Sequence, residues 1–189
     1  MLDIEKIESG KMNFNIRPQD LMELIEQVVK SNDGFAVQHG VRLQLTAVVH
    51  GTAVQADADR LVQVLTNLIS NACKFSPAGS SVDLAVSRRG ERLRVEVADH
   101  GPGISEDFRK RIFQKFSQAD ASNTRKEGGT GLGLSISKAI IERLGGEIGF
   151  FSEPGKGATF IVEIPLLGED AGTAGGESKL VRGRKAPAA

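Results

Sequence analysis

The chain of 189 residues has no tryptophan and no tyrosine, and Cys73 is its single cysteine. A disulfide framework and a cysteine-based zinc site are therefore excluded. Lys+Arg and Asp+Glu both number 24, and this zero net charge argues against a nucleic-acid-binding protein. No apolar run approaches the ~18 residues of a membrane-spanning helix. Because Asp3, Glu5 and Glu8 are acidic, we expect no signal peptide, and we expect a soluble chain from a reducing compartment.

Enough hydrophobic residues are present, at 40%, to form the core of one domain. Glycine is abundant, with 22 residues. Clustered glycines allow positive φ angles or a close approach to the backbone. The three histidines do not have a metal-ligand spacing. The glycine clusters are 101–103, 128–133, 145–149 and 155–157, and the histidines are His39, His50 and His100.

Hydrophobic periodicity predicts an α+β domain. Residues 1–9 are predicted to be helical, and Pro18 suits the first turn of a helix with an apolar stripe that begins at Leu21. Asp57 is a predicted N-cap for a helix over 57–76. Further helices are predicted over 105–112 and from Gly131 to Leu144, and strands over 41–47, 82–86, 92–98, 147–152 and 158–164. This order predicts a mixed sheet with helices on one face, followed by a Gly- and Ala-rich tail at 168–189 that is typical of disorder or a linker.

Three polar residues share one face of the predicted helix 57–76. Asn67 and Asn71 are four residues apart and Lys74 follows three later, on a face away from the apolar stripe. A carboxamide oxygen suits Mg²⁺, and a nearby lysine can neutralise phosphate. The alternative is an ordinary solvated helix face.

A carboxylate ends the predicted strand 92–98. Leu93, Val95 and Val97 point to one side, and the alternation of a strand places Asp99 on that same side. A buried carboxylate needs partners that offset its desolvation. The alternative is a surface Asp-Gly turn.

The glycine-rich run at residues 128–133 precedes a predicted helix, where free amides and the helix dipole favour phosphate. A dinucleotide-binding fingerprint would need a glycine in place of Ile136, and a Walker loop would need Ser or Thr in place of Gly157. Neither motif fits. The preceding Ser117–Gly129 segment has no large apolar residue and is predicted to be a functional or disordered loop.

These blocks, in this order, resemble the catalytic ATP-binding domain of sensor histidine kinases, within the gyrase/chaperone/kinase/mismatch-repair (GHKL) ATPase superfamily. The resemblance spans residues 12–165. It implies the GHKL (Bergerat) fold, a two-layer α/β sandwich with a mixed sheet and a mobile ATP lid at Ser117–Gly129. The matching segments are Leu65–Phe75 (N box), Asp99–Ile104 (G1 box), Arg111–Phe116 (F box), Gly129–Leu134 (G2 box) and Gly155–Phe160, a weaker glycine block that contains Thr159.

The resemblance implies ATP and Mg²⁺ as ligands and a role for each matching residue. Asp99 would accept a hydrogen bond from the adenine amino group. Asn71 would bind Mg²⁺, and Asn67 would support the phosphate end. Lys74 and Arg111 would hold phosphates. The other nucleotide-binding residues would be Phe75 beside the base, Gly101, Gly103 and Ile104 in the base pocket, and Gly129, Thr130, Gly131, Leu132, Gly133 and Thr159.

The segment Leu2–Met12 resembles the end of a dimerisation helix, and none of the three histidines lies in a suitable helix to be the phosphoacceptor. The resemblance therefore implies residues 1–11 as helix end or linker, 12–166 as catalytic domain and 167–189 as tail. The implied partners are a dimerisation domain that carries the phosphoacceptor histidine and a response-regulator receiver domain. The domain would be cytoplasmic and monomeric or weakly dimeric, in a soluble or membrane-attached homodimeric kinase.

Two alternatives share this pocket. ATP-hydrolysing relatives carry a water-activating glutamate four residues before the Mg²⁺ asparagine, where this chain has Asn67. An amide cannot act as a base, which favours the kinase. A serine kinase of the anti-sigma type is the other alternative, and the resemblance of Leu2–Met12 to a dimerisation helix argues against it.

Overall fold

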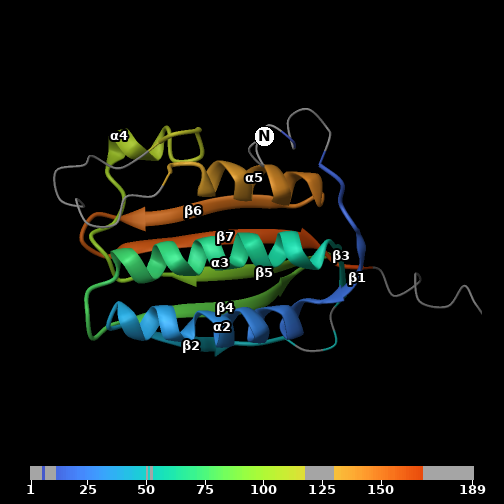
Figure 1. The fold of residues 1–189 in the computed structure, drawn as a ribbon, viewed down its shortest axis with the longest axis horizontal. Coiled ribbons are helices and arrows are strands. Elements are labelled where there is room, and N and C mark those ends of the chain that lie inside the picture. The colour runs from blue at the N-terminus through green and yellow to red at the C-terminus, as the bar shows by residue number, and fades with distance from the viewer. Residues whose placement is uncertain (1–5, 7–11, 50, 52, 118–129, 168–189) are drawn as a thin grey trace, which may run out of the picture.

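A computed structural model describes residues 6, 12–49, 51, 53–117 and 130–167. Figure 1 shows a sheet with helices packed on one face. The elements, in chain order, are β1 (Arg17–Asp20), α2 (Leu21–Gln38), β2 (Arg42–Ala47), β3 (Ala53–Ala56), α3 (Ala58–Phe75), β4 (Ser81–Arg89), β5 (Arg92–Ala98), α4 (Glu106–Arg109), α5 (Gly133–Arg143), β6 (Glu147–Glu153) and β7 (Gly157–Pro165).

The main sheet has five strands in the order β2-β4-β5-β7-β6. Strand β2 pairs with β4 in parallel, and the other neighbours are antiparallel. Helix α3 lies between α2 and α5 (Figure 1). The predicted α+β class, with a mixed sheet and helices on one face, is confirmed.

The core lies between the helices and the sheet. Leu61, Leu65 and Leu68 of α3 are at most 1% exposed, because the helix turns its apolar stripe to the strands. Charged residues occupy the face of the sheet away from the helices, where Arg94 binds Glu163 at 2.6 Å. One face of the sheet therefore provides the core, and the other faces solvent.

The predicted helix start at Pro18 is wrong. Pro18 lies in β1, which pairs with β3, and α2 begins only at Leu21. The Asp20 carboxylate accepts hydrogen bonds from the Met22 and Glu23 amides, at 2.9 and 3.3 Å, and so caps the helix. Proline has no N–H to donate, and an outer strand of a two-stranded sheet tolerates this.

Two other predicted helices are shorter than expected. Within 105–112 only α4 is α-helical, and α5 begins at Gly133 rather than at Gly131. Gly131 has a φ of 69°, which a helix does not allow, and a Cβ there would lie 2.8 Å from the backbone of Phe116. The glycine therefore serves the turn that precedes the helix.

Some predictions fall outside the described residues. These are the helix over 1–9 apart from Lys6, the lid at 118–129 with Gly129, and the tail at 168–189. Within the described part of the chain, no helix is long and apolar enough to cross a membrane.

The N-cap of α3 also ties down the segment before β1. The buried Asp57 carboxylate accepts hydrogen bonds from the Arg60 amide at 3.1 Å and from the Asn15 amide at 2.7 Å. Asp57→Ala removes the cap and leaves the Asn15 amide without this acceptor, so we expect a loss of about 2–3 kcal/mol in the free energy of unfolding. Urea denaturation measures it.

Asp20→Ala is the matched control, because Asp20 is an exposed N-cap whose bonds, among the described residues, stay within its own helix. Its removal should cost about 1 kcal/mol. Equal losses for the two variants would contradict a separate contribution from the Asn15 contact.

Candidate functional site

A cavity of about 190 Å³ opens at one end of the helix-covered face. Its walls are largely apolar, with Asn71 and Asp99 among the few polar side chains. The lining residues are Asn71, Phe75, Asp99, Pro102, Gly103, Ile104, Ser105, Phe108, Ile112, Leu134, Ala158 and Phe160. Five of the predicted site residues, Asn71, Phe75, Asp99, Gly103 and Ile104, therefore meet at one cavity.

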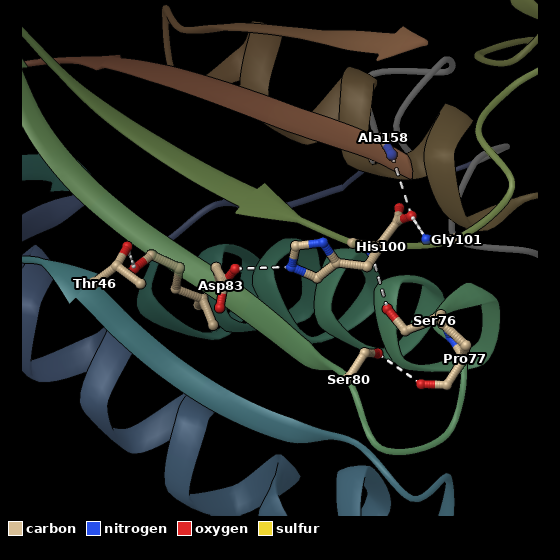
Figure 2. Close-up of polar contacts among 10 residues, drawn as sticks. Thr46, Ser76, Pro77, Ser80, Asp83, His100, Gly101 and Ala158 are labelled. Atoms are coloured by element: carbon tan, nitrogen blue, oxygen red, sulfur yellow. Dashed lines mark hydrogen bonds and ion pairs between the residues drawn. The ribbon is translucent and has the colours of Figure 1, made fainter. Parts of the chain in front are cut away.

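The Asp99 carboxylate is 8% exposed and fixed by two backbone amides. Its Oδ1 accepts hydrogen bonds from Gly101 at 2.8 Å and from Ala158 at 3.1 Å (Figure 2). Burial raises the pKa of Asp99 above its usual value, and these two amide donors oppose the shift. Among the described residues both bonds end on Oδ1, which leaves Oδ2 as an acceptor for a ligand.

His100 points the other way. Its Nε2 lies 3.0 Å from the Asp83 carboxylate, and its backbone amide donates to Ser76 Oγ at 3.4 Å (Figure 2). Consecutive side chains at the end of β5 therefore anchor the chain on opposite faces of the sheet. This contact engages the His100 ring outside the cavity.

The two asparagines of α3 have different surroundings. Asn71 lines the cavity, whereas Asn67 turns toward α5 and its Nδ2 donates to Ser137 Oγ at 3.1 Å. A Cβ at Gly133 would collide with the Asn67 amide, so the absent side chain allows the two helices to pack closely. The polar stripe is thus partly an interface between α3 and α5, not a solvated helix face.

The two predicted phosphate ligands, Lys74 and Arg111, lie outside the cavity wall. Lys74 is exposed at the end of α3, and Arg111 is exposed with its guanidinium 5.5 Å from the centre of the Phe108 ring. Neither side chain lines the cavity. Both remain predictions as phosphate ligands.

The start of α5 borders the same cavity through Leu134. Leu132 is the N-cap, and its side chain provides no capping hydrogen bond to the first turn. Thr130 Oγ1 accepts a hydrogen bond of 3.4 Å from the Leu132 amide. A helix start without a side-chain cap has amides available for an anion.

Thr159 is another predicted ligand that does not line the cavity. Its neighbours Ala158 and Phe160 line the cavity. Side chains alternate along β7, so Thr159 lies on the opposite face of the sheet. The resemblance carried this residue over with its block, and the alternation of the strand separates it from the cavity.

Sequence reasoning missed much of the apolar wall. Phe108 and Ile112 are four residues apart in a segment predicted to be helical, and that spacing was a usable signal for a shared face. Leu134 and Phe160 had only ordinary core patterns. The missed lining residues are Pro102, Ser105, Phe108, Ile112, Leu134, Ala158 and Phe160.

Comparison with known proteins agrees with this geometry. The chain is 41% identical over 173 residues to the sensor protein GacS of Pseudomonas syringae pv. syringae, covering 88% of this chain and 19% of GacS. It spans about a fifth of the length of the curated relatives that it matches. Among solved structures, full-length ShkA in complex with AMPPNP has a TM-score of 0.75 and 34% identity, covering 86% of this chain and 33% of ShkA. The catalytic domain of the histidine kinase ThkA has a TM-score of 0.69 and 29% identity, covering 80% of this chain and 96% of that domain.

The family match is specific and covers most of the described domain. Residues 56–168 match the family described as Histidine kinase-, DNA gyrase B-, and HSP90-like ATPase. This range contains α3, the cavity and the start of α5. The chain therefore belongs to the histidine kinase-, DNA gyrase B- and HSP90-like ATPase family.

Proposed function

We propose that this chain is the catalytic domain of a sensor histidine kinase, which binds ATP-Mg²⁺ and transfers the γ-phosphate to a histidine on a separate dimerisation domain. The observation that carries the proposal is the cavity itself, an apolar pocket with the Asp99 carboxylate on its wall and the Asn71 amide beside it. The relatives support it, because GacS is named a sensor protein and ShkA was solved with the ATP analogue AMPPNP.

The Asp99 end of the cavity suits adenine. The free Oδ2 can accept a hydrogen bond from the exocyclic amino group, while the flat base lies against apolar side chains such as Ile104 and Phe108. Guanine has an oxygen where adenine has its amino group. An oxygen that faces a carboxylate is repelled, so the pocket favours ATP over GTP.

The Asn71 end suits the phosphates. The available amides at the start of α5 can bind phosphate oxygens, and the exposed Lys74 and Arg111 supply positive charge.

The Asn71 oxygen can serve as one ligand of Mg²⁺, which usually keeps water and substrate oxygens as its others. The residues described hold no group of three His, Cys, Asp or Glu side chains that could bind a metal alone, which fits a metal that arrives with the nucleotide. When bound, Mg²⁺ supplies charge neutralisation to the phosphates.

The site favours transfer to a protein side chain over hydrolysis. Asn67 occupies the position where hydrolysing relatives carry glutamate, and its amide is hydrogen-bonded to Ser137. Phosphoryl transfer depends mainly on positioning and charge stabilisation, which this cavity can supply.

The two histidines in the described residues have other contacts. His39 Nδ1 lies 2.9 Å from the Phe35 carbonyl, and His100 binds Asp83. We assign the phosphoacceptor histidine to a separate dimerisation domain. The whole protein would be a homodimer that passes its phosphate to a receiver domain. This domain would lie in the cytoplasm, and its ATP lid would be Ser117–Gly129.

The first test concerns the base. Asp99→Asn removes the charged acceptor, so ATP binding should weaken by about 1.5–3 kcal/mol. GTP should bind the unmodified domain much more weakly than ATP. Isothermal titration calorimetry measures both. The matched control is Glu96→Gln, a carboxylate on β5, the strand that precedes Asp99. Glu96 contacts Arg94, and its substitution should leave ATP affinity unchanged. Equal affinity for ATP and GTP would remove Asp99 as the base-reading residue.

The second test concerns the metal. Asn71→Ala should abolish most of the gain in ATP affinity that Mg²⁺ provides, and it should leave adenosine affinity nearly unchanged. Titrations of ATP with and without Mg²⁺, and of adenosine, separate these effects. Ser70→Ala, one position earlier on α3, is the control and should keep the gain. A matched loss of ATP and adenosine affinity would mean that Asn71 has only a structural role.

The third test separates the kinase from a hydrolase. With labelled ATP alone, the chain should turn ATP over very slowly and acquire no acid-labile phosphate on His39, His50 or His100. With a separate dimerisation domain from its own full-length protein, it should label the histidine of that domain in trans. The rate should be lower than in a covalently linked kinase, because the effective concentration supplied by the link is lost. Rapid ATP turnover by the chain alone would instead support the hydrolase.

A further inference from the structure

The turn that forms one wall of the cavity has little secondary structure of its own. Pro102, Gly103 and Ile104 line the cavity between the end of β5 and the start of α4. Gly103 has a φ of 79°, and a Cβ on it would collide with the Glu153 carbonyl of β6. The turn therefore lies directly on the hairpin formed by β6 and β7, and contacts to that hairpin set its position.

Two hydrogen bonds connect the turn and this hairpin, and a third lies within the hairpin. The Gly155 amide donates to the Pro102 carbonyl at 2.8 Å, and the Ile104 amide donates to Ser152 Oγ at 2.9 Å. Ser152 Oγ donates in turn to the Gly157 carbonyl at 2.9 Å. Ser152 is 5% exposed, so the two bonds that its hydroxyl makes are shielded from water.

One arginine completes this connection from the outside. Arg109 Nε donates to the Ile104 carbonyl at 3.2 Å, and Arg109 Nη2 donates to the Ser152 carbonyl. Ile104 is thus held through both of its backbone groups, by Ser152 at the N–H and by Arg109 at the C=O. A guanidinium is suited to this because its rigid planar fork presents several donors at once.

Arg109 does not line the cavity, although Phe108 beside it does. Its side chain is 30% exposed, and its Nε also lies 3.3 Å from the carboxylate of Glu106, an exposed residue in the preceding turn. The cation is therefore directed at the backbone of the base-binding turn and at the hairpin below it. It is not directed at the space where a ligand would bind.

We infer that Arg109 is a positioning residue for the nucleotide base, acting by tying the turn at 102–104 to the hairpin at 152–157. This rests on the proposed function, since it assigns the turn to the adenine end of an ATP site. Holding the turn in its bound shape before the nucleotide arrives reduces the ordering cost of binding. The affinity for the base then depends on a side chain that never contacts it.

The test uses Arg109→Ala in the full chain, with affinity for ATP and for adenosine measured by calorimetry. Loss of two hydrogen bonds from a charged donor should weaken both ligands by the same factor, about tenfold. Arg109→Lys should be intermediate, because an ammonium does not reproduce the fork. Low-millimolar guanidinium should partly restore binding in Arg109→Ala. Lys110→Ala removes the next positive charge along the chain and should leave both affinities unchanged.

Hydrogen exchange measures, without any nucleotide, how firmly Arg109 holds the turn at 102–104. Arg109→Ala should speed exchange of the Ile104 amide and leave the amides of α2 unchanged. Ser152→Ala should weaken both ligands too. In the double variant the losses should be less than additive, because both residues hold the same turn.

Wild-type affinities retained in Arg109→Ala would overturn this inference alone. A loss confined to ATP would overturn it as well, since Arg109 would then act on the phosphates. A wild-type chain that bound neither ligand would overturn the proposed function and this inference together.

Discussion

The Asp99 carboxylate is the group on which the rest of the site depends. Burial disfavours its charge and raises the pKa of Asp99, so the carboxylate must be held by donors in the folded chain. The donors are the amides of Gly101 and Ala158, which meet at one oxygen. Gly101 begins the turn and Ala158 belongs to β7, so this oxygen extends the pairing of β5 and β7, in which the Asp99 amide donates to the Ala158 carbonyl at 2.8 Å. The cavity wall exists because those two backbones are brought together there.

The topology explains why the site lies at one end of the sheet. Strand β5 runs toward this end and β7 runs away from it, because the two pair in an antiparallel arrangement. Helix α3 ends there at Phe75, and α5 begins there at Gly133 (Figure 1). The site would combine the carboxylate that follows β5, the Asn71 amide near the end of α3 and the free amides at the start of α5. Such groups can meet only where the ends of these elements lie together. The helices cover one face, so the cavity opens between them and the sheet.

Patterns within a single strand or helix predicted those features of the site that depend on that element alone. Strand alternation placed Asp99 inward, and the apolar stripe of 57–76 placed the helix that carries Asn71. The two-stranded sheet of β1 and β3 could not be read in the same way, because each strand has four residues and its partner lies more than thirty positions away. The contribution of Leu134 to the cavity also depends on how α5 packs on the sheet. No spacing within one element encodes that contact.

Alternation and resemblance disagree at Thr159, and the disagreement is instructive. The resemblance assigned only Thr159 of the glycine block at 155–160 to the nucleotide, whereas Ala158 and Phe160 of that block line the cavity. The alternation of 158–164 in the sequence points Ala158 and Phe160 inward and Thr159 outward, so Thr159 as a nucleotide ligand stays a prediction. A motif match indicates where a segment lies in the fold. The alternation of the strand then decides on which face of the sheet each side chain lies.

The identity of residue 67 affects the packing of α3 against α5. Its amide nitrogen donates to Ser137 and its head group fills the space left by the missing side chain of Gly133. A glutamate at this position would be longer and would have no donor when ionised, so both contacts with α5 would change together. These contacts also hold the helix that borders the cavity through Leu134. Asn67, whose amide is not a base, therefore helps to place α5 against α3.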